Sequence, residues 1–298
     1  MARQFHNQPQ DSHQHRFLVD LWAETGLDVS VHALNGGVRG SDPRVLAMLI
    51  DGELEFATLM GPLIAGHVPA AEIQGVPFAF RDSTQAHAAM DHLADHLRAE
   101  MRPRGLHWLG VFENGMRHVC SVAKGIRHPA DLAGYRLRVP AAQIYAELFD
   151  ALGAVAVPVN IDRLYAALRD RAVDGHENPL AITEVNRLYE VTRNVSLTAH
   201  AWSGFNLVAN LRYWQSLPER TRAAIERAAK THVARQRAYT VALNAELETR
   251  LVQRGMSIMQ ADRTAFRRAI PAERYARWRQ RCGTTAWRLL EEVVGKLH

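Results

Sequence analysis

The chain has 298 residues, of which 47% are hydrophobic and 22% charged, the balance of a globular protein with one or two domains. Its formal net charge is +5, but the arginines are scattered among acidic residues, so the charge indicates a mild bias toward anions and no nucleic-acid partner. No apolar run approaches the roughly 18 residues that a membrane-spanning helix needs. The N-terminal residues lack the apolar segment of a signal peptide, which by itself favours the cytoplasm, although a mature exported domain with an added Met would look the same.

Short apolar runs alternate with helical patterns along the chain. The predicted strands cover residues 27–34, 54–60, 106–112, 118–122, 136–139, 155–159, 194–198, 205–209 and 256–260. The predicted helices cover residues 12–25, 43–51, 83–101, 141–152, 161–169 and 180–189. Strands that alternate with helices indicate an α/β fold with largely parallel strand pairing.

One further predicted helix is much longer than the rest. Residues 216–219 have the S-x-x-E pattern that begins a helix, and no Gly or Pro follows before Gly255. At ~1.5 Å per residue, a helix from 219 to 254 measures about 54 Å, several times the ~13 Å radius of gyration of a 100-residue domain. It is therefore predicted to lie across two lobes, unless a kink that the sequence does not reveal divides it.

Motifs of catalysis are sparse. The sequence contains no P-loop, no G-x-S-x-G and no H-E-x-x-H motif, and the Gly-rich stretch 35–40 has the wrong spacing for a dinucleotide site and is predicted as a loop. The two cysteines, Cys120 and Cys282, form no C-x-x-C pair, so no metal site, redox site or cofactor is predicted. We expect two buried thiols, with a single disulfide as the alternative in an oxidising compartment.

Polar residues gather in three segments beside predicted strands, at 112–118, 131–140 and 173–179. In the second, Arg136 and Arg138 point to the same face of a strand that Pro140 ends. Arg138 is therefore expected near the carboxyl end of the strand, where open α/β sheets bind ligands, and its guanidinium can grip a carboxylate through two parallel hydrogen bonds. In the third segment, Asn178 lies near a helix start, and its amide can both donate and accept.

Each of these residues also has a structural alternative. An arginine at a strand end, such as Arg138, can simply form a salt bridge. Arg117 can pair with Glu113, and Asn178 can be only a helix cap. The individual residues leave these alternatives open.

Together the segments resemble the solute-binding proteins of tripartite ATP-independent periplasmic (TRAP) transporters. The family pattern D-L-x-G-x-[KR]-x-R-V-P is met by 131–140, L-G-A-x-x-x-P by 152–158, and Y-x-A-L-x-x-x-x-V-D-G-x-E-N-P by 165–179. Upstream, 113–117 is similar to the family's E-N-G-x-R segment, and 6–9 resembles its first strand and turn. The resemblance covers nearly the whole chain. One departure is His176, which stands where Gln is common.

The resemblance implies two α/β lobes, joined by crossing segments, with a ligand cleft between them. Lobe I is expected to hold residues 1–114 and 203–242, and lobe II residues 115–202 and 243–298. Arg138 is implied to bind a carboxylate of the ligand. The other implied pocket residues are a second arginine, an amide, the turn after the first strand and two residues placed less securely, namely Arg117, Asn178, Asn7, Gln8, Met60 and Trp202.

The resemblance therefore predicts a periplasmic binding subunit, not an enzyme, that captures one small organic acid and delivers it to the membrane subunits of a transporter. The expected ligand is a dicarboxylate, a keto or hydroxy acid, a sugar acid such as a uronate, or an aromatic acid, and a monomer is expected. Two alternatives stay open. One is an α/β enzyme with Glu113, His176 or Glu177 as its base, and the other is a relative that senses a ligand and reports to a signalling partner.

Overall fold

A computed structural model describes residues 1–38 and 41–297. In this part of the chain one mixed sheet has the strand order β2-β1-β3-β8-β4-β7-β5-β6, and β9 pairs with β8. The strands are β1 (Ala2–Phe5), β2 (Val29–His32), β3 (Phe56–Met60), β4 (Leu106–Ser121), β5 (Arg136–Val139), β6 (Val155–Pro158), β7 (Gly175–Pro179), β8 (Asn194–Asn210) and β9 (Ser257–Gln260).

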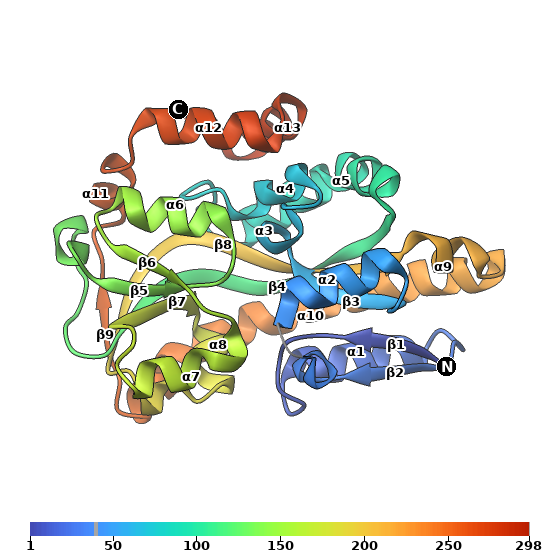
Figure 1. Ribbon diagram of the computed structural model, residues 1–298, viewed down its shortest axis with the longest axis horizontal. Coiled ribbons are helices and arrows are strands. Elements are labelled where there is room, and N and C mark those ends of the chain that lie inside the picture. Colours follow the sequence, from blue (N-terminus) through green and yellow to red (C-terminus); the bar gives the residue numbers. More distant parts are fainter. Residues whose placement is uncertain (39–40, 298) are drawn as a thin grey trace.

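The longest strands, β4 and β8, run antiparallel through both halves of the sheet (Figure 1). Two pairs of predicted strands, 106–112 with 118–122 and 194–198 with 205–209, are therefore two continuous strands. The polar residues in between stay extended because they find buried partners. The backbone N–H of Glu113 donates to Gln236 Oε1 at 2.8 Å.

The prediction of largely parallel pairing is wrong for the centre of the sheet. Here β3 pairs with β8, β8 with β4, and β4 with β7, all antiparallel. The reason is topological, because a strand that crosses from one half to the other must be matched by a strand that returns. Parallel pairing is found in the outer parts, where β1 joins β2 and β3, and β5 joins β6 and β7, and also between β8 and β9.

Helices flank the sheet (Figure 1). They are α1 (His13–Ala23), α2 (Ser41–Asp51), α3 (Gly61–Ile64), α4 (Ser83–His92), α5 (Ala94–Met101), α6 (Gln143–Ala151), α7 (Ile161–Arg169), α8 (Leu180–Val185), α9 (Leu211–Ser216), α10 (Glu219–Gln253), α11 (Arg263–Arg268), α12 (Ala272–Cys282) and α13 (Thr284–Val294). The helix predicted over 83–101 is two helices that meet at Leu93, and the one predicted over 180–189 ends at Val185. The predicted loop 35–40 begins within a 3-10 turn (Leu34–Gly37), and its residues 39–40 lie outside the described residues.

The long helix α10 runs from Glu219 to Gln253 without interruption, so the predicted helix is confirmed and the kinked alternative is not found. Its 35 residues correspond to about 53 Å. It packs on α1 in one half of the molecule and on α8 and β9 in the other. None of the described helices is long and apolar enough to cross a bilayer.

The C-terminal helices return to elements from early in the chain. α12 packs on the 3-10 segment η2 (Pro69–Gly75), and α13 packs on α4 and η2. Arg281 of α12 donates to Glu147 of α6 from Nη1 and from Nη2, at 2.8 Å each, and its Nε donates to Glu72 of η2. The segment formed by α12 and α13 therefore contacts elements of both expected lobes, and the assignment of residues 243–298 to lobe II stays a prediction. The lobe boundaries at 114 and 202 stay a prediction.

Both cysteines are free and buried, as expected. Cys120 lies on β4 and Cys282 ends α12. Burial raises the pKa of Cys120 to about 12, so its thiol is protonated and unreactive at neutral pH.

Candidate ligand-binding cleft

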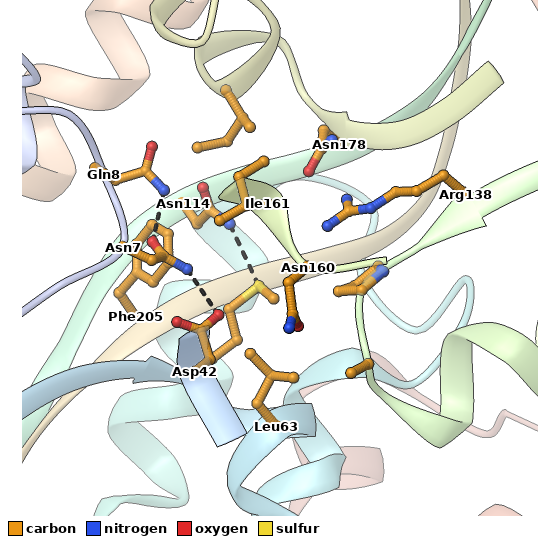
Figure 2. Close-up of a pocket in the computed structure, with 14 residues that line it drawn as sticks. Asn7, Gln8, Asp42, Leu63, Asn114, Arg138, Asn160, Ile161, Asn178 and Phe205 are labelled. Carbon is orange, nitrogen blue, oxygen red and sulfur yellow. Dashed lines mark hydrogen bonds between the residues drawn. The ribbon is translucent and has the colours of Figure 1, made fainter. Parts of the chain in front are cut away.

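Residues at the carboxyl ends of several strands converge on one cleft (Figure 2). They end or follow β1, β3, β5, β6 and β7. The lining is completed by the start of α2, by one residue each of α3 and α8, and by central positions of β4 and β8. The lining residues are Asn7, Gln8, Asp42, Met60, Leu63, Asn114, Arg138, Pro140, Ala141, Asn160, Ile161, Asn178, Ile182 and Phe205. The empty space among them is about 370 Å³, its opening included. This is the position at which open α/β sheets bind ligands.

Arg138 is the one basic side chain among the described lining residues. It is 2% exposed, and Figure 2 shows its guanidinium reaching toward the centre of the cleft. Its Nε donates to the carbonyl of Val159 at 2.7 Å, but Nη1 is buried and has no hydrogen-bond partner among the described residues. Burial lowers the pKa of Arg138 to about 10, which leaves it charged at neutral pH. A buried cation with an unused donor needs an anion, and the alternative of a structural salt bridge is not found in the described part of the chain.

The wall opposite Arg138 carries a buried carboxylate that is not among the predicted site residues (Figure 2). Asp42 lies in the first turn of α2 and is 7% exposed. Its Oδ2 accepts from Asn7 Nδ2 and its Oδ1 from Asn35 Nδ2, each at 2.9 Å. Burial raises the pKa of Asp42, although these two amides oppose the shift. Beside it, Gln8 Nε2 donates to Asn7 Oδ1 at 2.7 Å, whereas Gln8 Oε1 is buried and has no partner among the described residues.

Amide and apolar side chains complete the cleft. Asn178 is 4% exposed, and its Nδ2 lies 3.1 Å from His176 Nδ1. It does not cap α8, whose N-cap is Pro179, so the capping alternative is wrong. Asn114 Nδ2 donates to Ser203 Oγ at 2.9 Å. The larger apolar lining residues are Met60, Leu63, Ile161, Ile182 and Phe205.

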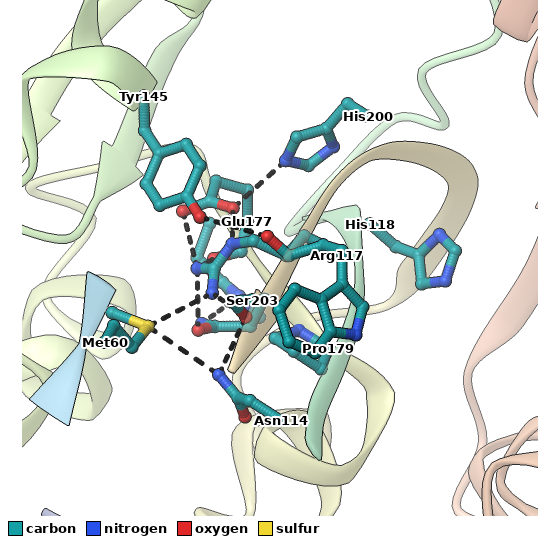
Figure 3. A network of polar contacts seen from close by, with 12 residues as sticks. Met60, Asn114, Arg117, His118, Tyr145, Glu177, Pro179, His200 and Ser203 are labelled. Carbon is teal, nitrogen blue, oxygen red and sulfur yellow. Dashed lines mark hydrogen bonds and ion pairs between the residues drawn. The ribbon is translucent and has the colours of Figure 1, made fainter. Parts of the chain in front are cut away.

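Arg117 does not line the cleft. Figure 3 shows its guanidinium among Glu177, Ser203 and Tyr145. Its Nε and Nη2 donate to the two carboxylate oxygens of Glu177 at 2.5 and 2.7 Å, and its Nη1 donates to Ser203 Oγ at 3.1 Å. The guanidinium also lies over the ring of Tyr145, 4.8 Å from its centroid. Every nitrogen of the fork is occupied within the protein, which differs from the expected direct contact with a ligand. The pairing with Glu113, the other alternative, is not found either.

The pair formed by Arg117 and Glu177 is fully buried, with side chains 1% and 0% exposed. Burial alone raises the pKa of Glu177, but the charge of Arg117 and a hydrogen bond from His200 override it and lower the pKa to about 2. Arg117 Nη1 also reaches Met60 Sδ at 3.6 Å, so the pair supports one lining residue directly.

Trp202 does not line the cleft, which differs from its expected place among the pocket residues. It is 0% exposed, and its indole N–H donates to Glu113 Oε2 at 2.8 Å. Ser83 Oγ donates to Glu113 Oε1 at 2.8 Å, and His87 contacts Oε2.

None of the three residues considered as a catalytic base lines the cleft. Glu113 and Glu177 are held in the networks above, and burial lowers the pKa of His176 to about 3, so this imidazole is neutral. Within the described residues, no group of three or more His, Cys, Asp and Glu side chains is placed to hold a metal ion. The cleft thus has the groups that bind a ligand, and none of the three residues considered as a base is among its lining residues.

A sheet divided by two crossing strands, one long helix along both halves and a polar cleft between them define a two-lobed solute-binding protein. The chain belongs to the family described as bacterial extracellular solute-binding protein, family 7, whose sequence model matches residues 6–279. This confirms the resemblance on which the predicted fold rests, and it places the chain among binding proteins rather than enzymes.

Several relatives show how far the likeness extends. The chain is 33% identical over 189 residues to the uncharacterized protein y4mM of Sinorhizobium fredii, covering 62% of this chain and 34% of that protein. It is 29% identical over 229 residues to the 2,3-diketo-L-gulonate-binding periplasmic protein YiaO of Escherichia coli, covering 76% of this chain and 66% of that protein. The chain thus spans about a third of the first relative and slightly under two thirds of the second.

Solved structures match over nearly the full length. A TRAP periplasmic solute-binding protein from Xanthobacter autotrophicus with bound β-D-galacturonate has a TM-score of 0.92 at 22% identity, covering 98% of this chain and 99% of that one. Another, from Chromohalobacter salexigens with bound D-glucuronate, has a TM-score of 0.92 at 23% identity and covers 100% of both chains. At these identities the likeness establishes the fold.

Proposed function

We propose that this chain is the extracytoplasmic binding subunit of a TRAP transporter and that it captures a small organic acid anion, with Arg138 binding the carboxylate. The observation that carries the proposal is the buried, charged guanidinium of Arg138, whose Nη1 has no partner among the described residues and whose fork reaches into the cleft. The relatives support it, because galacturonate, glucuronate and D-erythronate, found in solved structures of the family, all carry a carboxylate.

The energetics of the clamp favour a carboxylate strongly. A hydrogen bond to a charged group contributes about 1.5–3 kcal/mol, so two parallel bonds from Arg138 change the dissociation constant by a factor of roughly 100 or more. The ligand also satisfies the donor at Nη1, which is otherwise buried without a partner.

Ligand contacts from both halves of the molecule would favour the closed arrangement. Arg138 extends from β5, whereas Asn7 and Asp42 extend from the other side of the cleft. Only contacts that exist in the closed state and not in the open one can drive closure. We infer that the loaded, closed monomer acts in the periplasm and is recognised there by the membrane subunits of the transporter, as its family membership supports.

The test is isothermal calorimetry of Arg138→Ala with D-galacturonate, D-glucuronate and D-galactonate. We expect the wild-type protein to bind at least one of them and the variant to bind none, with little change in melting temperature. Arg136→Ala is the matched control, because Arg136 lies two residues earlier on the same strand but is exposed and paired with Asp174 at 2.6 Å. An Arg138→Ala protein with unchanged affinity would contradict the clamp.

A further inference from the structure

Beyond one carboxylate, the chemistry of the cleft wall facing Arg138 constrains the rest of the ligand. The described lining residues include one cation and one carboxylate, and Figure 2 shows them on opposing walls, with Arg138 on one side and Asp42 on the other. No other Lys, Arg, His, Asp or Glu of the described chain lines the cleft. The two ends of the ligand therefore meet opposite charges.

We propose that Asp42, with Asn7 and Gln8, selects a ligand whose far end carries hydroxyl groups and rejects one that carries a second carboxylate there. This inference rests on the proposed function, since Arg138 must hold the first carboxylate for the far end to face Asp42.

The direction of the hydrogen bonds on this wall is the first argument. Gln8 Nε2 donates to Asn7 Oδ1 at 2.7 Å, and Asn7 Nδ2 donates to Asp42 Oδ2 at 2.9 Å. Asn35 Nδ2 donates to the other oxygen of Asp42 at 2.9 Å. One N–H of each of these amides is thus directed at an acceptor within the wall, and each amide nitrogen has a second N–H. The wall also has acceptor capacity, namely a further lone pair on each oxygen of Asp42 and the buried Oε1 of Gln8, which has no partner among the described residues.

Only a donor can use this capacity. A sugar hydroxyl donates a hydrogen bond, whereas an ionised carboxylate has acceptors alone. A second carboxylate at this wall would leave Gln8 Oε1 without a donor and would meet the charge of Asp42 in a buried site, where like charges repel strongly and a polar group without a partner is costly.

The absence of a second available cation is the other argument. Arg117 is a second buried arginine, whose charge acts on Arg138 through space, and its Nε and Nη2 donate to the carboxylate of Glu177 at 2.5 and 2.7 Å. Its charge is therefore already compensated within the protein. A cleft built for a dicarboxylate needs a cation at each end, and this wall presents Asp42 in place of one.

The experiment compares acids that share a carbon skeleton and differ only at the far end. D-galactonate is paired with galactarate, D-gluconate with D-glucarate, and D-erythronate with meso-tartrate, and each dissociation constant is measured by calorimetry at pH 7.5. For the wild-type protein we expect the hydroxy monoacid that binds best to bind at least 100-fold more tightly than its diacid. In Asp42→Asn this ratio should fall below tenfold, because the monoacid loses an acceptor and the diacid loses a repulsive charge.

Two further variants separate direct contact from other effects. Asp162→Asn removes an exposed acid of α7 that acts on both Arg138 and Asp42 only through space, and it should change the ratio much less than Asp42→Asn does. Gln8→Leu should weaken monoacid binding at least tenfold, and it tests the wall without touching Asp42 should Asp42→Asn fail to fold.

The inference is overturned by a diacid that binds wild type as tightly as its matched monoacid, by an unchanged ratio in Asp42→Asn, or by failure of every hydroxy monoacid to bind. Its failure can be told from that of the proposed function. If diacids bind well and Arg138→Ala abolishes their binding, the carboxylate clamp holds and only the selection by Asp42 falls. If Arg138→Ala binds as well as wild type, the clamp itself falls.

Discussion

Two buried arginines, on strands separated only by β7, differ in their hydrogen-bond partners and in the direction of their pKa shifts. Arg117 on β4 is 1% exposed and Arg138 on β5 is 2% exposed. The fork of Arg117 is filled by Glu177 and Ser203, whereas Nη1 of Arg138 has no partner among the described residues. Burial on its own lowers the pKa of both. At Arg117 the charge of Glu177 overrides this and the pKa rises, while at Arg138 the pKa falls to about 10.

The contrast teaches that burial of an arginine does not by itself identify a binding site. What distinguishes Arg138 is hydrogen-bonding capacity that the protein leaves unused in a cleft. Arg117 has no unused hydrogen-bonding capacity. Its replacement is therefore expected to affect the stability of the wall behind Met60 rather than the binding of the ligand.

The largest effect should appear when each arginine is replaced by alanine and unfolding is followed in urea. Arg117→Ala leaves the carboxylate of Glu177 buried without its partner, which costs about 3–5 kcal/mol of unfolding free energy. Arg138→Ala should cost less than about 1 kcal/mol, because it breaks no ion pair and removes a desolvated charge. Arg187→Ala is the control. Arg187 is an exposed partner of Glu190, so this variant should leave the free energy of unfolding almost unchanged. Equal destabilisation by the first two variants would remove the distinction between the arginines.

A smaller effect, on ligand affinity, should follow when the guanidinium of Arg138 is replaced by the ammonium group of a lysine. Arg138→Lys keeps the positive charge but cannot form two parallel hydrogen bonds, so we expect affinity for the best-binding sugar acid to fall at least tenfold, or about 1.4 kcal/mol. Calorimetry gives the affinity, and an unchanged melting temperature confirms that the variant is folded. Full affinity in Arg138→Lys would mean that charge alone attracts the ligand.

The smallest effects concern the two carboxylates, whose pKa values move in opposite directions. The pKa of Glu177 is lowered to about 2, so the stability it contributes is present above its usual value of 4.5 and is lost as the pH falls toward 2. The pKa of Asp42 is raised above 3.8, so its protonation stabilises the folded protein as the pH falls through that raised value.

Urea midpoints between pH 6 and pH 3 measure both effects. As the pH falls, the free energy of unfolding of wild type should decrease relative to that of Glu177→Gln. It should increase relative to that of Asp42→Asn. His118, whose pKa burial lowers to about 3, affects all three proteins alike. The pKa values of His200 and His176 depend on Glu177, so their titration is part of the difference measured for Glu177→Gln. Slopes of the same sign for both variants would show that the two carboxylates do not differ as described.

Elements defined by local patterns were predictable from the sequence. The bounds of β5 and α7 coincide with the predicted ranges, and α10 ends one residue earlier than predicted, because alternation, periodicity and helix-stop signals are all local. The continuity of β4 was not predictable. Its polar centre at Glu113 resembles a chain break, and the partner that satisfies it, Gln236, lies 123 residues away.

For the site residues too, local sequence patterns were predictive and contacts with distant residues were not. Arg138, Asn178, Asn7 and Gln8 line the cleft and come from motif segments, and Met60, which was placed less securely, lines it too. Their contact with a ligand stays a prediction. Asp42 could not be found, because an acidic residue in a first helical turn is common and only its distant partners Asn7 and Asn35 make it part of a wall. Arg117 and Trp202 were predicted in the cleft because the resemblance places residues along the chain without showing which face each one occupies.

The contact of Arg281 with both Glu72 and Glu147 has a mechanical consequence for the opening of the cleft. It joins η2 to α6 through α12, along one edge of the molecule, while α1 and α7 lie toward the other edge (Figure 1). A rotation that parts Asn7 from Asn160 can keep the bonds of Arg281 only if its axis passes close to α12. The two halves of the protein then stay in contact along the edge at α12, and they separate most at the opposite edge, formed by α1 and α7.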